Sequence, residues 1–274
     1  MACPPPSRAN RSSGWWRRTG GPVRRSVALR VVVGVVSFSA LVGCLNSGGT
    51  APRLIGEGRR VLFIGNSYLY VQDIPGIVQA LADSAGGDKL AVETVAGADM
   101  ALVDHWANGQ ARTEIAKGGW EWVVLQQGPS SVEANRDTLR LGTALFAGEI
   151  VKVRAKPALF SAWPTSGRLV DFPRAIQSYQ LAAADVNGVF LPVASSWLGA
   201  WSRDPSIQLY LDGLHPSTEG AYLASLVVYG RLLGKTTKGL PAALRLRSGA
   251  TIAVSVANAA MLQAAADSAL ATLP

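Results

Sequence analysis

The amino-acid sequence predicts an α/β protein of three layers, in which a mostly parallel sheet of about five strands lies between helices. Short continuous apolar runs alternate with longer segments that repeat apolar residues at helical spacing. Glycine or proline commonly bounds these runs, which is typical of strands buried on both faces. Strands separated by helices of this length form βαβ units and therefore a parallel sheet covered on both sides.

The first strand and the first helix illustrate the pattern. Val61–Ile64 is an unbroken apolar run that ends at Gly65, and the helix that follows stops at Gly86 and Gly87. Strands are expected at 61–64, 90–95, 122–125, 158–161 and 189–193, and helices at 74–86, 137–154, 172–186 and 217–233. The Ala-rich run from Thr251 to Leu273 is expected to form one long helix packed on the body.

The basic charge of the chain is concentrated in its first residues. The formal net charge is +8, but residues 1–43 hold seven of the 26 Lys and Arg residues and no Asp or Glu. The other 19 basic residues face 18 acidic ones, so the body is nearly neutral. A near-neutral body lacks the phosphate-tracking surface of a nucleic-acid binder, and that class is excluded.

Residues 1–43 are expected to be an export signal. An arginine-rich stretch precedes the apolar run Val31–Gly43, which is short for a membrane span but typical of a signal-peptide core. The run ends in Leu-Val-Gly-Cys44, which resembles the bacterial lipobox. The resemblance implies cleavage before Cys44, lipidation of its thiol, and anchoring in the bacterial cell envelope, since several acyl chains hold durably. The alternative is an uncleaved anchor helix with an incidental cysteine.

The chain after this leader is expected to divide into three parts. Residues 44–58 are expected to be a flexible tether, 59–240 the main domain, and 241–274 a helical extension packed on it. The only other cysteine, Cys3, would leave with the leader. The mature chain then has no thiol for a disulfide, a redox pair or a thiolate metal site.

Two histidines are available as a general base, His105 and His215. Asp212 stands three residues before His215, with Gly213 between them and Pro216 able to start the next helix. A carboxylate so placed can accept the Nδ1 proton of the imidazole and leave Nε2 free to take a proton from a nucleophile. His105 is read either as a substrate contact or as a partly buried helical histidine.

Ser67 is the expected nucleophile. It follows the first strand in Phe63-Ile-Gly-Asn-Ser67, at the carboxyl end where open α/β sheets place their active sites. Its position near a helix amino end would favour a developing oxyanion. The alternative is a serine that only caps a turn or helix.

Together, Gly65-Asn66-Ser67 and Asp212-Gly-Leu-His215 resemble the first and last sequence blocks of the SGNH (GDSL-type) hydrolases, in the right order and over roughly residues 59–235. The resemblance implies a flavodoxin-like fold, no metal or other cofactor, and a Ser67-His215-Asp212 triad that hydrolyses esters or removes acetyl groups. It also implies an oxyanion hole of Ser67, Gly97 and a donor after the third strand. Here Gln127 stands for the usual asparagine, with Gln126 or no side-chain donor as alternatives.

The sequence therefore predicts an exported, lipid-anchored serine esterase whose substrate carries ester or O-acetyl groups, on a small molecule or a glycan. Loop tryptophans favour a glycan because aromatic faces stack on sugar rings, although packing is the simpler role for each one. These are Trp106, Trp163, Trp197 and Trp201. One alternative is a non-catalytic glycan-binding lipoprotein on the same fold. A nucleotide or flavin binder is disfavoured because no glycine-rich phosphate loop follows any strand.

Overall fold

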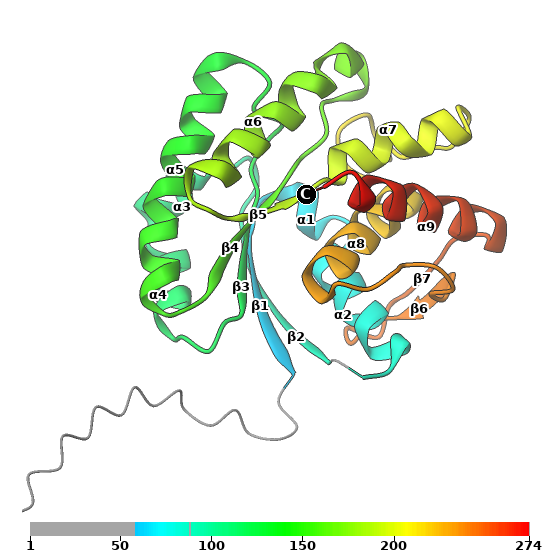
Figure 1. The fold of residues 1–274 in the computed structure, drawn as a ribbon, viewed down its shortest axis with the longest axis horizontal. Helices are drawn as coiled ribbons and strands as arrows, with labels where there is room; N and C mark the ends of the chain where they lie inside the picture. Colours follow the sequence, from blue (N-terminus) through cyan, green and yellow to red (C-terminus); the bar gives the residue numbers. More distant parts are fainter. Residues whose placement is uncertain (1–57, 88, 274) are drawn as a thin grey trace, which may run out of the picture. The chain divides into compact units, whose positions relative to one another are not determined.

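Five parallel strands form one sheet in the order β2-β1-β3-β4-β5, in a computed structural model that describes residues 58–87 and 89–273 (Figure 1). The strands are β1 Arg59–Gly65, β2 Leu90–Ala96, β3 Trp122–Leu125, β4 Lys156–Phe160 and β5 Val189–Leu191. The chain passes from β1 to β2 on one side and then crosses to β3 on the other side of β1. The strand order thus reverses between β1 and β3, and open sheets of this kind bind their ligands at the carboxyl ends of such a strand pair.

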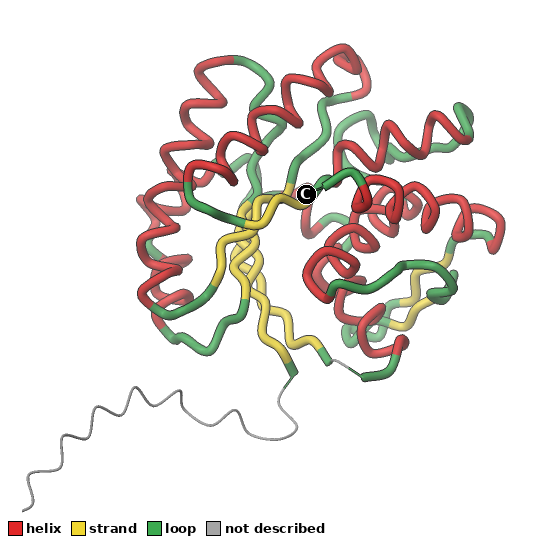
Figure 2. The backbone as a smooth tube through the Cα atoms, in the orientation of Figure 1, coloured by secondary structure: helices red, strands yellow, loops and turns green. Residues whose placement is uncertain are grey.

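Helices cover both faces of this sheet, so the predicted three-layer α/β/α architecture is confirmed (Figures 1 and 2). One layer contains α3 Leu102–Asn108, α4 Gln110–Ala116, α5 Glu133–Lys152 and α6 Phe172–Asp185. The other contains α2 Ile74–Ala85, α7 Val193–Arg203, α8 Thr218–Leu233 and α9 Val256–Ala271.

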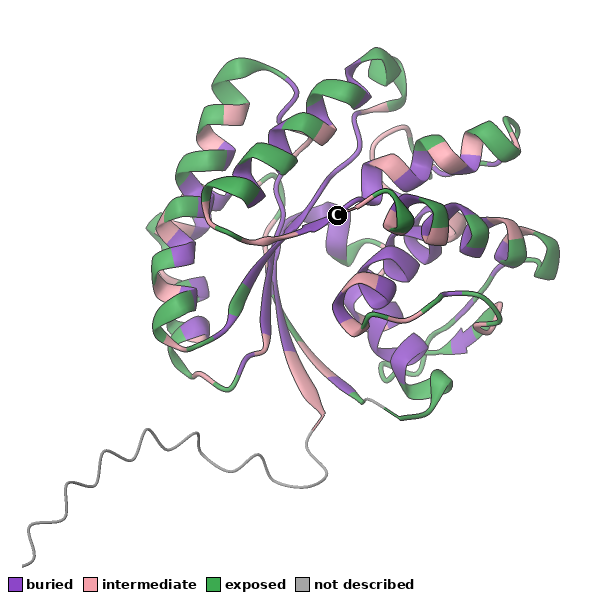
Figure 3. Cartoon of the chain, in the orientation of Figure 1, coloured by how far each residue is buried: buried purple, intermediate pink, exposed green. Residues whose placement is uncertain are grey.

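The core follows from this layering. All four residues of β3 and the last five of β1 are buried, as expected for strands covered on both faces (Figure 3). Helix α8 is apolar on nearly every side because α2, α7 and α9 all pack against it. The C-terminal helix therefore completes the burial of α8.

The structure adds elements that the sequence patterns did not predict. Helices α4 and α7 were not expected, nor were the short α1 Ser67–Tyr70 and the 3₁₀ helix η1 Ser166–Asp171. Helix α3 was expected only in the interpretation that makes His105 a helical histidine. The fifth strand stops at Leu191 because Pro192, at the N-cap of α7, ends it. The expected helix from Thr251 begins only at Val256, where Ser255 caps it by accepting from the Asn258 N–H. Before it, β6 Ala243–Arg245 pairs antiparallel with β7 Thr251–Ala253.

The predicted leader 1–43, the lipidation site Cys44 and the tether up to residue 57 lie outside the described residues. In the part of the chain that is described, no helix has the length and apolar character needed to cross a membrane.

Candidate active site

Ser67 is the first residue of α1, immediately beyond β1 and beside the point where the strand order reverses. Asn66 caps this short helix, since its Oδ1 accepts the Tyr68 backbone N–H at 3.2 Å. The Asn66 amide Nδ2 donates to the Met100 carbonyl at 3.2 Å, which joins the serine segment to the loop after β2. Ser67 is only 8% exposed, so a substrate must enter a recess to reach it.

The buried side chain of Gln126 fixes the backbone that carries Ser67. Its Oε1 accepts the Asn66 backbone N–H at 2.9 Å, and its Nε2 donates to Asn66 Oδ1 at 3.0 Å. Gln126 lies so close to Gly65 that a Cβ added there would stand 2.2 Å from its Oε1. Gly65, two residues before Ser67, therefore lacks a side chain where Gln126 and Leu69 approach closely. The sequence suggested Gln126 only as an alternative oxyanion donor and gave no signal for this framework role.

His105 is a second support of the same segment. It is buried, and its Nε2 lies 2.7 Å from the Gly65 carbonyl oxygen, which can only accept a hydrogen bond. Burial lowers the pKa of His105, against a smaller opposing effect of the hydrogen bond to Gly65. A neutral His105 with its proton on Nε2 satisfies this geometry. Of the two interpretations of His105, the structure supports the buried helical histidine.

Asp212 and His215 form the expected carboxylate–imidazole pair. Asp212 Oδ2 lies 2.7 Å from His215 Nδ1, while Oδ1 accepts the backbone N–H groups of Leu214 at 3.0 Å and His215 at 2.7 Å. The hydrogen bond from the His215 side chain, followed by those from the two backbone amides, lowers the pKa of Asp212 to about 2. Asp212 is therefore charged at neutral pH and holds the imidazole with its proton on Nδ1, which leaves Nε2 as an acceptor.

The loop that carries this pair is tied to the segment after β4. The Trp163 indole N–H donates to the Leu214 carbonyl at 3.0 Å, and the Ser166 N–H donates to the Gly213 carbonyl at 2.8 Å. Gly213 has φ +86°, a left-handed conformation that favours glycine. Trp163 is itself fixed, because it stacks on Trp197 with ring centroids 4.0 Å apart. Nothing in the sequence pattern identified Trp163 as an anchor of the histidine loop.

Ser67 and the histidine loop meet at one cavity of about 250 Å³. Ser67 lines it together with Leu214, the residue before His215. The ring of Tyr68, the residue after Ser67, lies 6.5 Å from the His215 ring between centroids. The topology thus brings the two ends of the domain to one site. Among the described residues, no hydrogen bond joins Ser67 Oγ to the His215 ring.

Two of the three expected oxyanion donors, Gly97 and Gln127, are engaged within the protein. The Gly97 N–H donates to the Gly65 carbonyl at 3.2 Å. The Gln127 Nε2 donates to Ser130 Oγ at 2.9 Å and to the Asn135 carbonyl at 3.3 Å, so both of its hydrogens have partners. In this geometry neither group offers a free hydrogen to a substrate. The Ser67 N–H, in the first turn of α1, has no intrahelical acceptor and is the available member of the expected set.

The tryptophans do not form an exposed platform. Trp163 and Trp197 are fully buried, and Trp106 and Trp201 are partly buried against the core. Packing, the simpler of the two expected roles, accounts for them.

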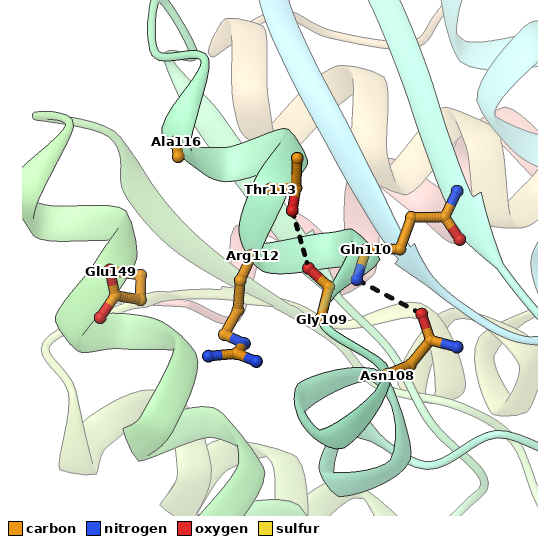
Figure 4. A pocket seen from close by; sticks show the side chains of 7 residues that line it. All are labelled: Asn108, Gly109, Gln110, Arg112, Thr113, Ala116 and Glu149. Atoms are coloured by element: carbon orange, nitrogen blue, oxygen red, sulfur yellow. Dashed lines mark hydrogen bonds between the residues drawn. The ribbon is translucent and has the colours of Figure 1, made fainter.

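A second hollow, of about 690 Å³, lies against α3, α4 and α5 (Figure 4). Two of its polar groups bond where α3 ends and α4 begins: Thr113 Oγ1 donates to the Gly109 carbonyl, and the Gln110 N–H donates to Asn108 Oδ1. None of the predicted site residues lines it. Within residues 58–87 and 89–273, no cluster of three His, Cys, Asp or Glu side chains is arranged to hold a metal.

No family model matches the sequence, and no curated protein does. Solved structures match the fold. A DUF4886 family protein from Bacteroides uniformis is 14% identical, with a TM-score of 0.64 over 79% of this chain and 96% of that one. A protein from Slackia heliotrinireducens, provisionally classed as an SGNH hydrolase, is 22% identical, with a TM-score of 0.55 over 64% and 100%. An acetyl xylan esterase is 13% identical, with a TM-score of 0.52 over 62% and 98%. The chain thus has the SGNH-hydrolase fold, as its two terminal motifs indicated.

Proposed function

We propose that this protein is a serine esterase of the SGNH type that cleaves ester or O-acetyl groups with Ser67, His215 and Asp212. The observation that carries the proposal is the Asp212–His215 hydrogen bond of 2.7 Å. It orients an imidazole with an unused Nε2 beside the cavity that Ser67 and Leu214 share. The fold supports it as well, because the structural neighbours include proteins described as an SGNH hydrolase and an acetyl xylan esterase.

The proposed reaction is a two-step acyl transfer. His215 Nε2 takes the Ser67 hydroxyl proton as Oγ attacks the ester carbonyl, and Asp212 stabilises the resulting imidazolium. His215 then gives that proton to the departing alcohol, which leaves an acyl group on Ser67. Water attacks the acyl-enzyme with His215 again as the base, and this step releases the acid and restores Ser67. A shift of the histidine loop on substrate binding would make the Ser67–His215 hydrogen bond.

The Ser67 backbone N–H is the first donor that we assign to the oxyanion of the tetrahedral intermediate. Gly97 and Gln127 remain predicted donors that would have to exchange their present bonds to Gly65, Ser130 and Asn135. One missing donor costs a rate factor of ~10²–10³. A modest turnover number is therefore expected.

Pre-steady-state hydrolysis of p-nitrophenyl acetate tests the proposed enzyme class. Formation of an acyl-enzyme predicts a burst of p-nitrophenol equal in amount to the active protein, followed by slower steady turnover. Acetate release is then measured from acetylated fragments of xylan, chitin and peptidoglycan. The fragment that is cleaved identifies the alcohol part of the substrate. Binding of these glycans without turnover would instead support the glycan-binding lipoprotein.

We also propose that the protein is exported and held in the bacterial cell envelope by lipid on Cys44. The support is the sequence alone: the lipobox-like end of the apolar run and the concentration of arginine before it. Metabolic labelling with a fatty-acid analogue should mark the wild-type chain in the membrane fraction, whereas Cys44→Ser should lose the label. An unlabelled wild-type chain would contradict the proposed anchor without affecting the esterase proposal.

A further inference from the structure

The charged residues of the body are separated between the two edges of its sheet, although the body is nearly neutral in total. Around the amino ends of the strands, the chain segments are 58–60, 86–89, 117–121, 153–156 and, after α8, 234–242. Their basic residues are Arg59, Arg60, Lys89, Lys117, Arg154, Lys156, Lys235 and Lys238. Their acidic residues are Glu121 and, outside the described residues, Asp88. This edge, which we call the basic edge, therefore has an excess of positive charge.

The opposite edge of the sheet, where Ser67 lies, has an excess of negative charge. Its segments, at the carboxyl ends of the strands, are 66–73, 97–101, 126–132, 161–171 and 204–217. Their acidic residues are Asp73, Asp99, Asp171, Asp204 and Asp212, and Arg168 is their one Lys or Arg. The body is thus an electric dipole whose positive end lies opposite the candidate active site.

Half of the cations at the basic edge are available to a ligand. Three others are paired with glutamates at 2.5 to 2.7 Å. The exposed basic residues that form no ion pair within residues 58–87 and 89–273 are Lys89, Arg154, Lys156 and Lys238. Their charges are not neutralised by neighbouring carboxylates and can attract an anionic surface.

One part of the basic edge is hollowed. The end of α2, at Ser84 and Ala85, and the segment after α8 enclose a space of about 490 Å³. Lys235, Thr236 and Lys238 line this space. A hollow with two ammonium groups and a hydroxyl fits a phosphate, which lysine binds as a point charge.

The chain also enters the body at the basic edge. Gly58, the first described residue, leads directly into the amino end of β1 (Figure 1). The segment from Cys44 to Gly58 spans at most about 50 Å even when fully extended. A lipid on Cys44 would therefore keep the basic edge close to the bilayer.

We propose that the basic edge docks on the phosphate headgroups of an anionic membrane, so that the site around Ser67 faces away from the lipid. The inference rests on the proposed envelope location and is independent of the esterase chemistry. Its basis is electrostatic, because anionic phospholipids attract the basic edge and repel the acidic one. Each Lys or Arg at such a surface strengthens binding by roughly fivefold. An enzyme held in this orientation takes its substrate from outside the bilayer.

The test is sedimentation of a chain that begins at residue 44 and carries Cys44→Ser, so that neither the arginine-rich leader nor a lipid contributes. Every strand and helix of the described fold lies between Arg59 and Ala271, so this chain keeps the whole core. It should bind vesicles of phosphatidylglycerol and phosphatidylcholine in equal parts at low salt. It should not bind phosphatidylcholine alone, and high salt should release it.

Charge-neutralising variants then locate the surface. Arg154→Gln with Lys156→Gln should weaken binding by about 25-fold, as should Lys89→Gln with Lys238→Gln. Arg136→Gln with Arg174→Gln makes the same change in net charge in the first turns of α5 and α6, at the acidic edge, and should leave binding unchanged. Thermal unfolding of each variant checks that it is folded.

Three results would overturn the proposal. The first is a wild-type chain that ignores phosphatidylglycerol or binds both kinds of vesicle equally. The second is an equal loss of binding in all three double variants, and the third is binding to a soluble polyanion such as heparin without binding to vesicles. None of these results bears on labelling at Cys44 or on ester hydrolysis, so the three proposals fail separately.

Discussion

The serine segment after β1 and the histidine loop before α8 are held in the fold by different means. Asn66 and Ser67 are buried, and the side chains of Gln126 and His105 bond to them or to the adjacent Gly65. In the histidine loop, the side chain of Asp212 is 49% exposed and that of His215 is 21% exposed. Hydrogen bonds to its backbone carbonyls, at Gly213 and Leu214, hold this loop.

This difference indicates which half of the site can adjust. Ser67, the proposed nucleophile, is part of the packed core, where a displacement would break several buried hydrogen bonds. His215, the proposed base, lies on a partly exposed loop, and such segments shift at lower cost than a packed core. The contact between Ser67 and His215 is therefore expected to form by movement of the histidine loop.

The largest effect on activity is expected when the Ser67 hydroxyl is removed. Ser67→Ala should lower kcat by roughly 10⁴- to 10⁶-fold, because the covalent route disappears while binding remains. Ser131→Ala is the matched control, since Ser131 is also buried and bonds to Asp171 rather than to a substrate. Steady-state hydrolysis of p-nitrophenyl acetate measures both. A Ser67→Ala protein of wild-type activity would remove the serine from the mechanism.

On the histidine side, Asp212→Asn should lower kcat by ~10²–10⁴-fold, because the amide no longer holds the proton on Nδ1 and cannot stabilise the imidazolium. With its pKa at about 2, Asp212 stays charged at mildly acidic pH, so protonation of Asp212 should not lower the activity of the wild type in that range. Asp204→Asn is the control, as Asp204 lies in another exposed turn with Ser206. A pH–rate profile of each variant checks this, and equal profiles for Asp212→Asn and Asp204→Asn would contradict it.

Removing the hydrogen bond by which Trp163 anchors the histidine loop should lower kcat by an intermediate factor. Trp163→Phe keeps the aromatic packing on Trp197 but removes the N–H that bonds to the Leu214 carbonyl. We expect kcat to fall by about tenfold with a loss of only ~0.5–1.5 kcal/mol in the free energy of unfolding. Trp201→Phe removes a similar indole bond, to Ile207, and should lower stability without the same fall in kcat. Parallel losses of kcat in both variants would show a general packing effect instead.

The smallest expected effect is on the free energy of unfolding, whose pH dependence should change when the buried His105 is replaced. Burial lowers its pKa in the folded protein from the ordinary 6.5, so below that pH the unfolded chain binds a proton that the folded chain does not. The free energy of unfolding should therefore decrease as the pH falls below about 6.5. His105→Gln keeps an N–H donor for Gly65 without titrating, and its stability should depend less on pH. Urea unfolding at pH 7.5 and 5.5 measures how much the free energy of unfolding of each protein changes between the two pH values. Equal changes for wild type and His105→Gln would contradict a neutral buried His105.

The sequence predicted the sheet and the Asp212–His215 pair because these depend on local patterns. The apolar runs around Val61–Ile64 and Trp122–Leu125 have the length and continuity of buried parallel strands, and Asp212 reaches His215 within one turn. The supports of the site are non-local. Gln126 bonds to Asn66 across 60 positions, and Trp163 bonds to Leu214 across 51. No local pattern encodes such pairs. The engagement of the Gly97 amide by Gly65 depends likewise on the register of β1 and β2.

The most direct test of the account is to identify the residue that a fluorophosphonate modifies, by peptide mass spectrometry of wild type and His215→Ala. The account predicts one adduct, on Ser67, formed at a rate that falls by several orders of magnitude when the imidazole is removed. An adduct on another serine, or labelling of Ser67 at the same rate without His215, would contradict the claim that these two residues share a proton.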